Sequence, residues 1–458
     1  MQRTVMSKLM EWKIAPERKP LILRGARQVG KTWLLREFGE KNFRVVHTLN
    51  FEKLAGISKV FAEDLSPRVI IAGLELMLKR EIDPENDLII FDEIQAVPRA
   101  LTSLKYFAEE FPNYHIAAAG SLLGLHLNPA SFPVGKVEMV DLFPMSFQEF
   151  LDGIGEQKLV SVLRKLSHEP LPCNCEIPQV SHELLWEQFK NYLVVGGMPE
   201  VVSVFAKQRE KSLFSAFTSV RSKQKQLIDA YFSDIAKHSG KVNAMHIERV
   251  LRSVPAQMAS GVDTQLPKYV FKDVIPGVRG YERMAAAIDW LQKAGLIVRL
   301  PIVNSGELPF LAHSSENFFK LALFDVGILG ALAALPPQAI LDYDFGSYKG
   351  YFVENFVLQQ FIASGLDNLA CWREGDSEVE FLAVSRSGAA IPIEVKAGLQ
   401  TKAKSLGVFR QRYAPPYAIL LSGVLGRREQ AGVYRWPIYT AGLFRDSSFS
   451  AGGAPESE

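Results

Sequence analysis

Short apolar runs alternate with amphipathic stretches over the first 150 residues of the chain. Four of these runs have the length and composition of strands, at Pro20–Leu23, Arg44–Leu49, Leu88–Phe91 and His115–Ala119. This alternation is typical of a parallel sheet flanked by helices. The run Leu88–Phe91 has no polar residue, which indicates a central strand buried on both faces. The pattern therefore predicts an α/β domain at the start of the chain.

The pattern changes after a proline-rich stretch near residue 175. Residues 184–251 are mostly helical in pattern, and Gly196-Gly197-Met198-Pro199 predicts the end of one helix and the start of the next. A helical stretch followed by the β-like run Leu296–Leu300 is the order found in winged-helix modules. Further on, one helix and three strand-like runs follow, at Phe352–Ser364, Val379–Val384, Ile391–Lys396 and Tyr417–Leu421. A second domain containing a sheet is therefore expected near the C-terminus.

Composition narrows the class of protein. The chain has 458 residues, 48% of them hydrophobic and 22% charged, which excludes general disorder and suggests about three domains. A net charge of +2 means that any basic surface must be local, and three cysteines exclude a disulfide scaffold. The most apolar run, Leu321–Leu335, contains Asp325 and is shorter than the ~20 residues of a membrane span. We read it as a buried helix following a strand, and expect a cytoplasmic protein.

The strongest chemical signal follows the first strand. It is the G-x4-G-K-[ST] pattern Gly25-Ala26-Arg27-Gln28-Val29-Gly30-Lys31-Thr32. Its glycines allow positive φ, so that successive backbone N–H groups can point at one anion, and the helix beginning near Lys31 adds its N-terminal partial charge. Lys31 can reach the β- and γ-phosphates of a nucleotide, and the Thr32 hydroxyl can ligate Mg2+. The sequence therefore predicts a triphosphate-binding loop.

Two carboxylates and a serine follow the next buried strands. Asp92 and Glu93 come directly after Leu88–Phe91, at the strand end where open α/β sheets bind ligands. We expect Asp92 to hold Mg2+ through its water shell and Glu93 to polarise the attacking water. Ser121 follows the strand His115–Ala119 and can contact that water or the γ-phosphate, although Gly120-Ser121 can also be a simple turn.

The acidic pair also bears on the nucleotide class. Kinases and guanine-nucleotide switches do not usually carry a glutamate in this place, and the chain has no N-K-x-D motif, so ATP hydrolysis is favoured over GTP binding. The interval between Thr32 and Asp92 leaves room for the strand Arg44–Leu49. That spacing is typical of P-loop proteins in which the strand that precedes the phosphate-binding loop and the strand that ends in the acidic pair are not consecutive in the sequence.

Five motifs in one order resemble a known family. They are GARQVGKT (25–32), LIIFDEIQ (88–95), AGS (119–121), LFPMSFQEF (142–150) and VVGGMPEVV (194–202). The chain resembles the uncharacterised bacterial and archaeal P-loop ATPases of the AAA superfamily that carry a C-terminal domain of unknown function. In the segment where that family usually has Gly-Arg, this chain has Gly135-Lys136. An arginine guanidinium can bind a phosphate through two N–H groups at once, whereas a lysine ammonium offers only a compact charge.

The resemblance implies a fold and a domain order. It implies an AAA-type ATPase core at 1–150, a helical lid at 151–240, a winged-helix-like domain at 241–335 and a domain related to PD-(D/E)xK nucleases at 336–445. The tail 446–458 is small and polar and is expected to be disordered. The predicted fold class is thus α/β, with a parallel-sheet core and a C-terminal restriction-endonuclease-like domain.

The last domain carries a candidate second site. Nucleases of the resembled fold use carboxylates to hold Mg2+ or Mn2+ and a lysine to position water. Glu394 and Lys396 are two apart on a predicted strand and so share a face, while Glu380 and Glu354 can complete an acidic cluster. Glu-x-Lys is a common pattern, and the resembled family usually has Asp in place of Glu380. A retained fold without cleavage and a solvated sheet edge therefore remain as alternatives.

The sequence favours an ATP-hydrolysing molecular switch whose nucleotide state controls a DNA or protein partner. One alternative is an ATP-gated, Mg2+-dependent DNA nuclease acting through Glu380, Glu394 and Lys396. Another is an interaction protein that binds ATP without hydrolysing it. No membrane partner is expected. Assembly as a homo-oligomer, with an arginine from a neighbouring subunit at the ATP site, is left open.

Overall fold

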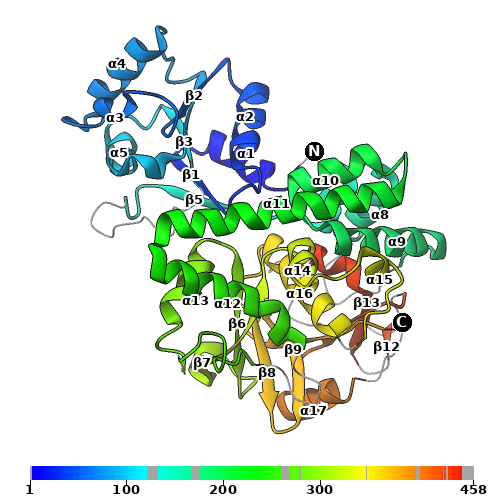
Figure 1. Ribbon diagram of the computed structural model, residues 1–458. Helices are drawn as coiled ribbons and strands as arrows, with labels where there is room; N and C mark the ends of the chain where they lie inside the picture. The colour runs from blue at the N-terminus through cyan, green and yellow to red at the C-terminus, as the bar shows by residue number, and fades with distance from the viewer. Residues whose placement is uncertain are drawn as a thin grey trace. The chain divides into compact units, whose positions relative to one another are not determined.

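The computed structural model divides the chain into two compact units. It describes residues 3–120, 133–167, 176–259, 268–277, 280–346, 348–398, 403–425, 428–429 and 432–445. One unit, here the N-terminal unit, comprises residues 2–143 with 293–295, and the other, the C-terminal unit, comprises 144–292 and 296–458 (Figure 1). Ser121 and the tail 446–458 lie outside the described residues. None of the helices in the described ranges combines the length and apolar character that crossing a bilayer requires.

A five-stranded sheet in the order β2-β3-β4-β1-β5 forms the centre of the N-terminal unit, with every neighbouring pair parallel. Its strands are β1 Leu21–Arg24, β2 Val45–Asn50, β3 Asp87–Asp92, β4 His115–Gly120 and β5 Glu138–Asp141. Strand β3 is buried along its whole length, which confirms the central strand expected from its apolar run. Strand β4 separates β3 from β1 in the sheet, so the acidic strand and the loop strand are not neighbours, as their spacing predicts.

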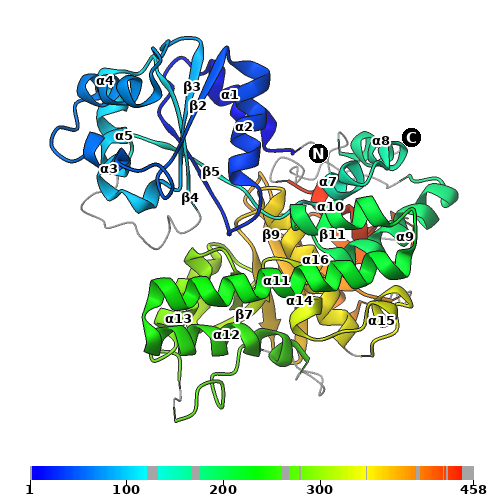
Figure 2. The same ribbon diagram turned by 45° about the horizontal axis from the view of Figure 1, so that its top comes forward.

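Helices cover both faces of this sheet, with α1 and α2 on one side and α3, α4 and α5 on the other (Figure 2). They are α1 Met6–Ile14, α2 Lys31–Asn42, α3 Ile57–Val60, α4 Pro67–Leu78 and α5 Pro98–Glu110, with the short η1 Ile94–Ala96 after β3. Helix α5 shows why they form: Pro98 occupies its first position, and Leu101, Leu104 and Phe107 are buried at helical spacing. The expected parallel sheet with flanking helices is thus present.

The C-terminal unit combines helices with a second sheet. The helices before the sheet are α7 Phe147–Gly153, α8 Gln157–Leu166, α9 Gln179–Val195, α10 Pro199–Gln208, α11 Leu213–Ser239, α12 Lys241–Ala259 and α13 Ala285–Lys293. The helices that come after the first strand of this sheet along the chain are η2 Phe310–His313, α14 Val326–Leu332, α15 Pro337–Leu341, α16 Tyr348–Ala363, α17 Lys404–Tyr413 and η3 Ile438–Leu443. The helical stretch expected over 184–251 is present, and the break at Gly196 separates α9 from α10.

The second sheet has eight strands in the order β12-β13-β11-β10-β9-β8-β6-β7 and is mixed. Its strands are β6 Ile297–Val303, β7 Ser314–Leu323, β8 Ala370–Glu374, β9 Ser377–Val384, β10 Ala390–Lys396, β11 Ala418–Ser422, β12 Arg428–Glu429 and β13 Val433–Pro437. The hairpin β6–β7 follows α13, in the order expected of a winged-helix segment. Strand β6 also pairs in parallel with β8, through Ile302 opposite Cys371. The middle segment and the C-terminal segment therefore share one sheet across residue 335, and the five-part domain division stays a prediction.

The apolar run Leu321–Leu335 completes β7 and then forms α14. Asp325 lies between them, is fully buried, and accepts hydrogen bonds from the backbone N–H of Ile328 at 2.9 Å and of Gly197 at 2.6 Å. The side chain of Gln359 on α16 donates a third, at 3.2 Å. Burial raises the pKa of Asp325 to about 6, even though these hydrogen bonds act in the opposite direction. One carboxyl group thus joins the α9–α10 turn, α14 and α16.

Gly197 lies where no side chain fits. A Cβ at this position would be 2.2 Å from the carbonyl oxygen of Met145, and the Gly197 oxygen itself accepts a hydrogen bond from the Met145 N–H at 2.7 Å. The hydroxyl of Tyr192 donates to the same Met145 carbonyl at 2.6 Å. The motifs LFPMSFQEF and VVGGMPEVV are therefore backbone partners, and their glycine is explained by close approach.

Gly197→Ala is expected to lower the free energy of unfolding of the C-terminal unit by about 2–3 kcal/mol, because backbone atoms must move to admit the methyl group. Gly350→Ala on α16 is the matched control, since a Cβ there meets nothing within 4 Å, and it should be neutral or stabilising by up to about 1 kcal/mol. Urea denaturation of both variants beside the wild type measures the difference. Equal midpoints for Gly197→Ala and the wild type would contradict the argument.

Candidate functional site

The loop between β1 and α2 is shaped as an anion cradle. Gly25 and Gly30 both have positive φ, at 153° and 96°, and α2 begins at Lys31. A Cβ on Gly25 would be only 2.1 Å from the carbonyl oxygen of Leu142, so a larger residue does not fit there. The loop therefore turns tightly into the N-terminus of a helix, where free N–H groups favour a bound anion.

Lys31 is buried beneath this loop, with only 7% of its surface exposed. Its Nζ donates hydrogen bonds to the carbonyl oxygens of Gly25 at 2.9 Å and Ala26 at 2.8 Å. Burial lowers the pKa of Lys31 to about 8, because the nearby carboxylates of Glu93 and Asp92, which raise the pKa, only partly offset the effect of burial. The ammonium group is thus satisfied by main-chain oxygens, and phosphate oxygens can replace them as acceptors.

Asp92 lies at the carboxyl end of β3 and is held from two sides. The Thr32 hydroxyl donates to its Oδ1 at 2.8 Å, and the side-chain amide of Asn50 donates to its Oδ2 at 2.9 Å. Asn50 is itself fixed, because its Oδ1 accepts the N–H groups of Glu52 and Lys53. A hydroxyl and a carboxylate in direct contact are the hard oxygen ligands that Mg2+ takes beside a nucleotide, so these residues fit the ion.

Glu93 has a left-handed backbone, with φ 53° and ψ 43°. Few residues other than glycine adopt this conformation, and such strain is concentrated at functional sites. The side chain is half-buried, and its Oε2 accepts a hydrogen bond from Gln95 Nε2 at 2.6 Å. Because β3 and β1 both run parallel to β4, Glu93 after β3 lies at the same edge of the sheet as the loop after β1.

The structure therefore brings together four of the predicted residues, Lys31, Thr32, Asp92 and Glu93. Ser121 lies outside the described residues, so its predicted role stays a prediction. Lys136, which stands where the resemblance leads one to expect arginine, forms an ion pair with Glu109 at 3.0 Å.

Three residues that the sequence analysis did not single out also contribute. Asn50 ends β2, and Gln95 belongs to the motif LIIFDEIQ, so position alone could have drawn attention to both. Arg3 gave no such signal. Its buried guanidinium donates to the carbonyl oxygens of Val29 at 3.1 Å and Phe143 at 2.6 Å, which ties the phosphate loop to the N-terminal segment.

The second predicted site lies in the C-terminal unit, on the antiparallel strands β9 and β10. Lys396 Nζ lies 2.5 Å from Glu394 Oε1 and 3.7 Å from Glu380 Oε1. Glu380 Oε2 also accepts the backbone N–H of Val395 at 3.0 Å. Burial raises the pKa of both glutamates, and their mutual repulsion adds to the effect on Glu380. Although burial opposes it, the two carboxylates raise the pKa of Lys396 to about 12.

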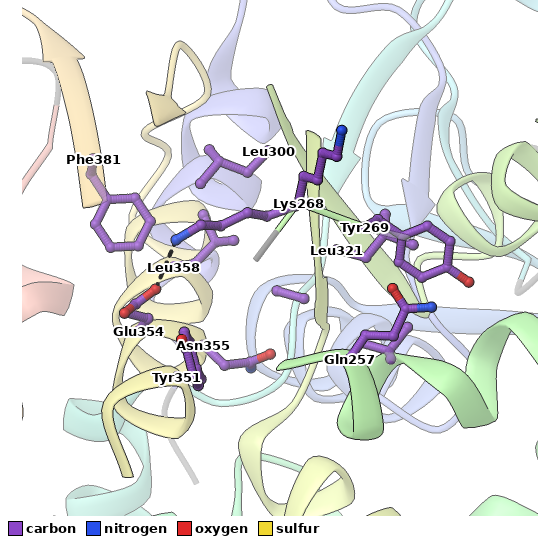
Figure 3. Close-up of a pocket in the computed structure, with 13 residues that line it drawn as sticks. Gln257, Lys268, Tyr269, Leu300, Leu321, Tyr351, Glu354, Asn355, Leu358 and Phe381 are labelled. Carbon is purple, nitrogen blue, oxygen red and sulfur yellow. Dashed lines mark hydrogen bonds and ion pairs between the residues drawn. The ribbon is translucent and has the colours of Figure 1, made fainter. Parts of the chain in front are cut away.

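Glu354 on α16 forms an ion pair with Lys320 of β7, with 3.0 Å between Nζ and Oε2, and its charge also acts on the cluster of Glu380, Glu394 and Lys396. The ion pair, drawn as a dashed line in Figure 3, borders a pocket that is otherwise mainly apolar, lined by Leu300, Leu358 and Phe381 among others. Across the described parts of the chain, no three His, Cys, Asp or Glu side chains are grouped so that they could hold a metal ion. The second metal ion predicted at this cluster is therefore not shown and stays a prediction.

Comparison with protein families places three matches along the chain. Residues 17–151 match the AAA domain family AAA_14, residues 186–339 match a domain of unknown function, DUF8612, and residues 349–439 match another, DUF4143. A comparison with curated proteins finds no match.

Several solved structures are similar to this chain at low sequence identity. The Walker-type ATPase PABY2304 of Pyrococcus abyssi is 17% identical, with 72% of this chain and 95% of that chain covered and a TM-score of 0.44. Orc1 of Aeropyrum pernix, solved in complex with DNA, is 14% identical over 74% and 95% of the two chains, with a TM-score of 0.31. The RuvB Holliday junction branch migration motor of Thermotoga maritima is 14% identical over 65% and 87%, with a TM-score of 0.30.

The parallel sheet, the phosphate-binding loop and the family match all point to the same assignment for residues 17–151. Residues 17–151 form an AAA-type P-loop ATPase domain. The relation of the C-terminal unit to nucleases is not shown by its two matches, since both are families of unknown function.

The lowered pKa of Lys31 predicts that ATP binding takes up protons above neutral pH. With a pKa of about 8, much of the free lysine is neutral at pH 8.5, and the triphosphate restores its charge. Binding at that pH should therefore take up roughly 0.7 proton, and affinity should fall as the pH rises further. Isothermal titration calorimetry in buffers of different ionisation enthalpy measures the uptake. Lys31→Met should bind more weakly without this uptake, and an equal uptake in the variant would contradict the assignment.

Proposed function

We propose that the protein is an ATP-hydrolysing molecular switch. The observation that supports this most directly is the 2.8 Å hydrogen bond between Thr32 and Asp92, with Lys31 and Glu93 beside it. A phosphate-binding loop alone would be consistent with many nucleotide-binding proteins. The paired acids at the end of the buried strand β3 add the groups that hydrolysis requires.

Each residue has a distinct part in this proposal. The N–H groups from Gly25 to Thr32 bind the β- and γ-phosphates, and Lys31 exchanges its two carbonyl partners for phosphate oxygens. Thr32 and Asp92 would hold Mg2+, while Asn50 keeps the aspartate in place. When bound, the ion supplies positive charge that stabilises the charge developing on the transferred phosphate.

Glu93 is the proposed general base. It follows Asp92 directly, and its carboxylate is kept near the loop by the left-handed turn of the backbone. It accepts a hydrogen bond from the attacking water and takes up its proton as the oxygen bonds to the γ-phosphorus. The leaving group is ADP, which departs with the former bridging oxygen.

The C-terminal unit is the proposed output of the switch. Loss of the γ-phosphate releases loops that the triphosphate orders, and such order-to-disorder changes are a common way of passing a nucleotide state to another part of a protein. We infer that the predicted helical lid, the winged-helix-like segment and the nuclease-like segment respond in this way and control a DNA or protein partner.

Two variants separate binding from hydrolysis. Glu93→Gln should keep its affinity for ATP within about threefold and lose at least about a hundredfold in kcat, because only the proton acceptor is removed. Lys31→Ala should lose binding as well. Glu110→Gln, an exposed carboxylate on α5, is the matched control and should behave as the wild type. Phosphate release and ATP titration measure the two quantities.

Wild-type turnover in both Lys31→Ala and Glu93→Gln would exclude this site as the origin of hydrolysis. ATP binding that raises the melting temperature of the wild type without any phosphate release would instead favour the non-hydrolysing interaction protein.

A second candidate function is supported by the convergence of Glu380, Glu394 and Lys396 on two neighbouring strands. Two buried carboxylates beside a half-buried lysine are common at functional sites, and the resemblance implies a fold related to PD-(D/E)xK nucleases for this segment. No metal-binding group is found here among the described residues, so we derive no cleavage step from this site.

Plasmid DNA incubated with the protein, Mg2+ or Mn2+, and ATP or ADP tests this candidate. Nuclease activity from this site requires cleavage by the wild type that falls at least about tenfold in Lys396→Ala. Lys404→Ala, on the neighbouring α17, provides a control for loss of a positive charge. Equal cleavage by the wild type and Lys396→Ala would show that the activity does not come from this site.

A further inference from the structure

The residue that contacts the proposed base most closely is Gln95, two positions after it in the short η1 helix. Its Nε2 donates to Glu93 Oε2 at 2.6 Å, a short distance for this kind of hydrogen bond. Only one carboxylate oxygen is engaged in this way, so Gln95 leaves Oε1 of Glu93 available.

The other half of the same amide is unusual. Gln95 Oε1 is buried and has no hydrogen-bond partner among the described residues. Leaving a buried acceptor unsatisfied costs about 1–3 kcal/mol, so such atoms are rare and call for an explanation. The amide therefore donates to Glu93 through Nε2, while its Oε1 accepts no hydrogen bond from any residue that the structure describes.

The backbone next to Gln95 also has an uncommon conformation, at Glu93. The left-handed φ of Glu93 brings residues 93–96 into a tight turn, closed by the hydrogen bond from the Ala96 N–H to the Glu93 carbonyl oxygen at 3.0 Å. Strain and an unsatisfied acceptor thus coincide within three residues, beside the buried cation Lys31.

We propose that Gln95 is a positioning residue for ATP hydrolysis, which holds the Glu93 carboxylate through Nε2 and accepts a hydrogen bond from the attacking water through Oε1. The inference rests on the proposed function, because it assigns a partner to the proposed base. A water has two O–H groups, and an acceptor for each of them fixes its orientation. One goes to Glu93, which takes the proton, and the other to the amide oxygen, which takes none.

This arrangement also explains why an amide suits the position better than an acid. The Nε2 donor stabilises the charged carboxylate, which is the form that can accept a proton. A second carboxylate at 2.6 Å would instead repel that charge and would itself compete for the proton. A purely structural role for Gln95 would not require a donor on the Nε2 side of the amide and an acceptor on the Oε1 side.

Two substitutions of Gln95 and one control test the proposal. Gln95→Ala removes both ends of the amide, and Gln95→Glu keeps the shape while replacing the donor by an oxygen. The control is Gln179→Glu, because Gln179 makes the same kind of contact with Glu183, Nε2 to Oε1 at 2.8 Å, on the exposed surface of α9. Steady-state phosphate release, ATP titration and thermal unfolding are measured for each protein at pH 7.

Gln95→Ala is expected to lower kcat about tenfold to a hundredfold, with the affinity for ATP changed less than about threefold. Gln95→Glu should lower kcat at least as far at pH 7. Gln179→Glu should match the wild type within about twofold.

Unchanged kcat in both Gln95 variants, with Glu93→Gln inactive, would overturn this inference and leave the proposed function standing. A loss confined to ATP affinity or to melting temperature would overturn it too, since it would show a structural role only. Absence of ATP turnover in the wild type would overturn the proposed function and this inference with it.

Discussion

The hydrogen bond from Thr32 to Asp92 joins the two halves of the ATPase site, and it depends on the order of strands in the sheet. Thr32 begins the helix that follows β1, whereas Asp92 ends β3, and the two strands are separated by β4. All five strands run parallel, so their carboxyl ends meet at one edge. Lys31, Asn50, Glu93 and Gln95 reach the same point for that reason, although they come from distant parts of the chain.

In the C-terminal unit a buried acid has a comparable structural role without any proposed chemistry. Asp325 receives hydrogen bonds from two backbone N–H groups and from Gln359, and so holds a turn and two helices together. A buried carboxyl group is costly unless its oxygens are satisfied, and here both are. The double glycine of the motif VVGGMPEVV is needed because the turn approaches this group and Met145 too closely for a side chain.

Local signals in the sequence were sufficient for most of the N-terminal unit. The apolar runs located four strands to within a residue or so at each end, and the loop and the acidic pair lie together as expected of a parallel sheet. Contacts between distant segments could not be predicted. Nothing in the run Leu321–Leu335 shows that Asp325 caps a helix and binds Gly197, and Glu354 carries no mark of its pairing with Lys320. The parallel pairing of β6 with β8 likewise joins residues about seventy positions apart, beyond any local pattern.

That pairing has a consequence for how the two families of unknown function are related. The matches to DUF8612 and DUF4143 meet between residues 339 and 349, yet the sheet continues from one to the other through β6 and β8. A protein that carried only one of these segments would expose a bare strand edge, which invites pairing with other chains. We therefore expect the two segments to have been inherited or lost together. A protein that has only one of them is expected to cover that edge with an extra strand or with a second subunit.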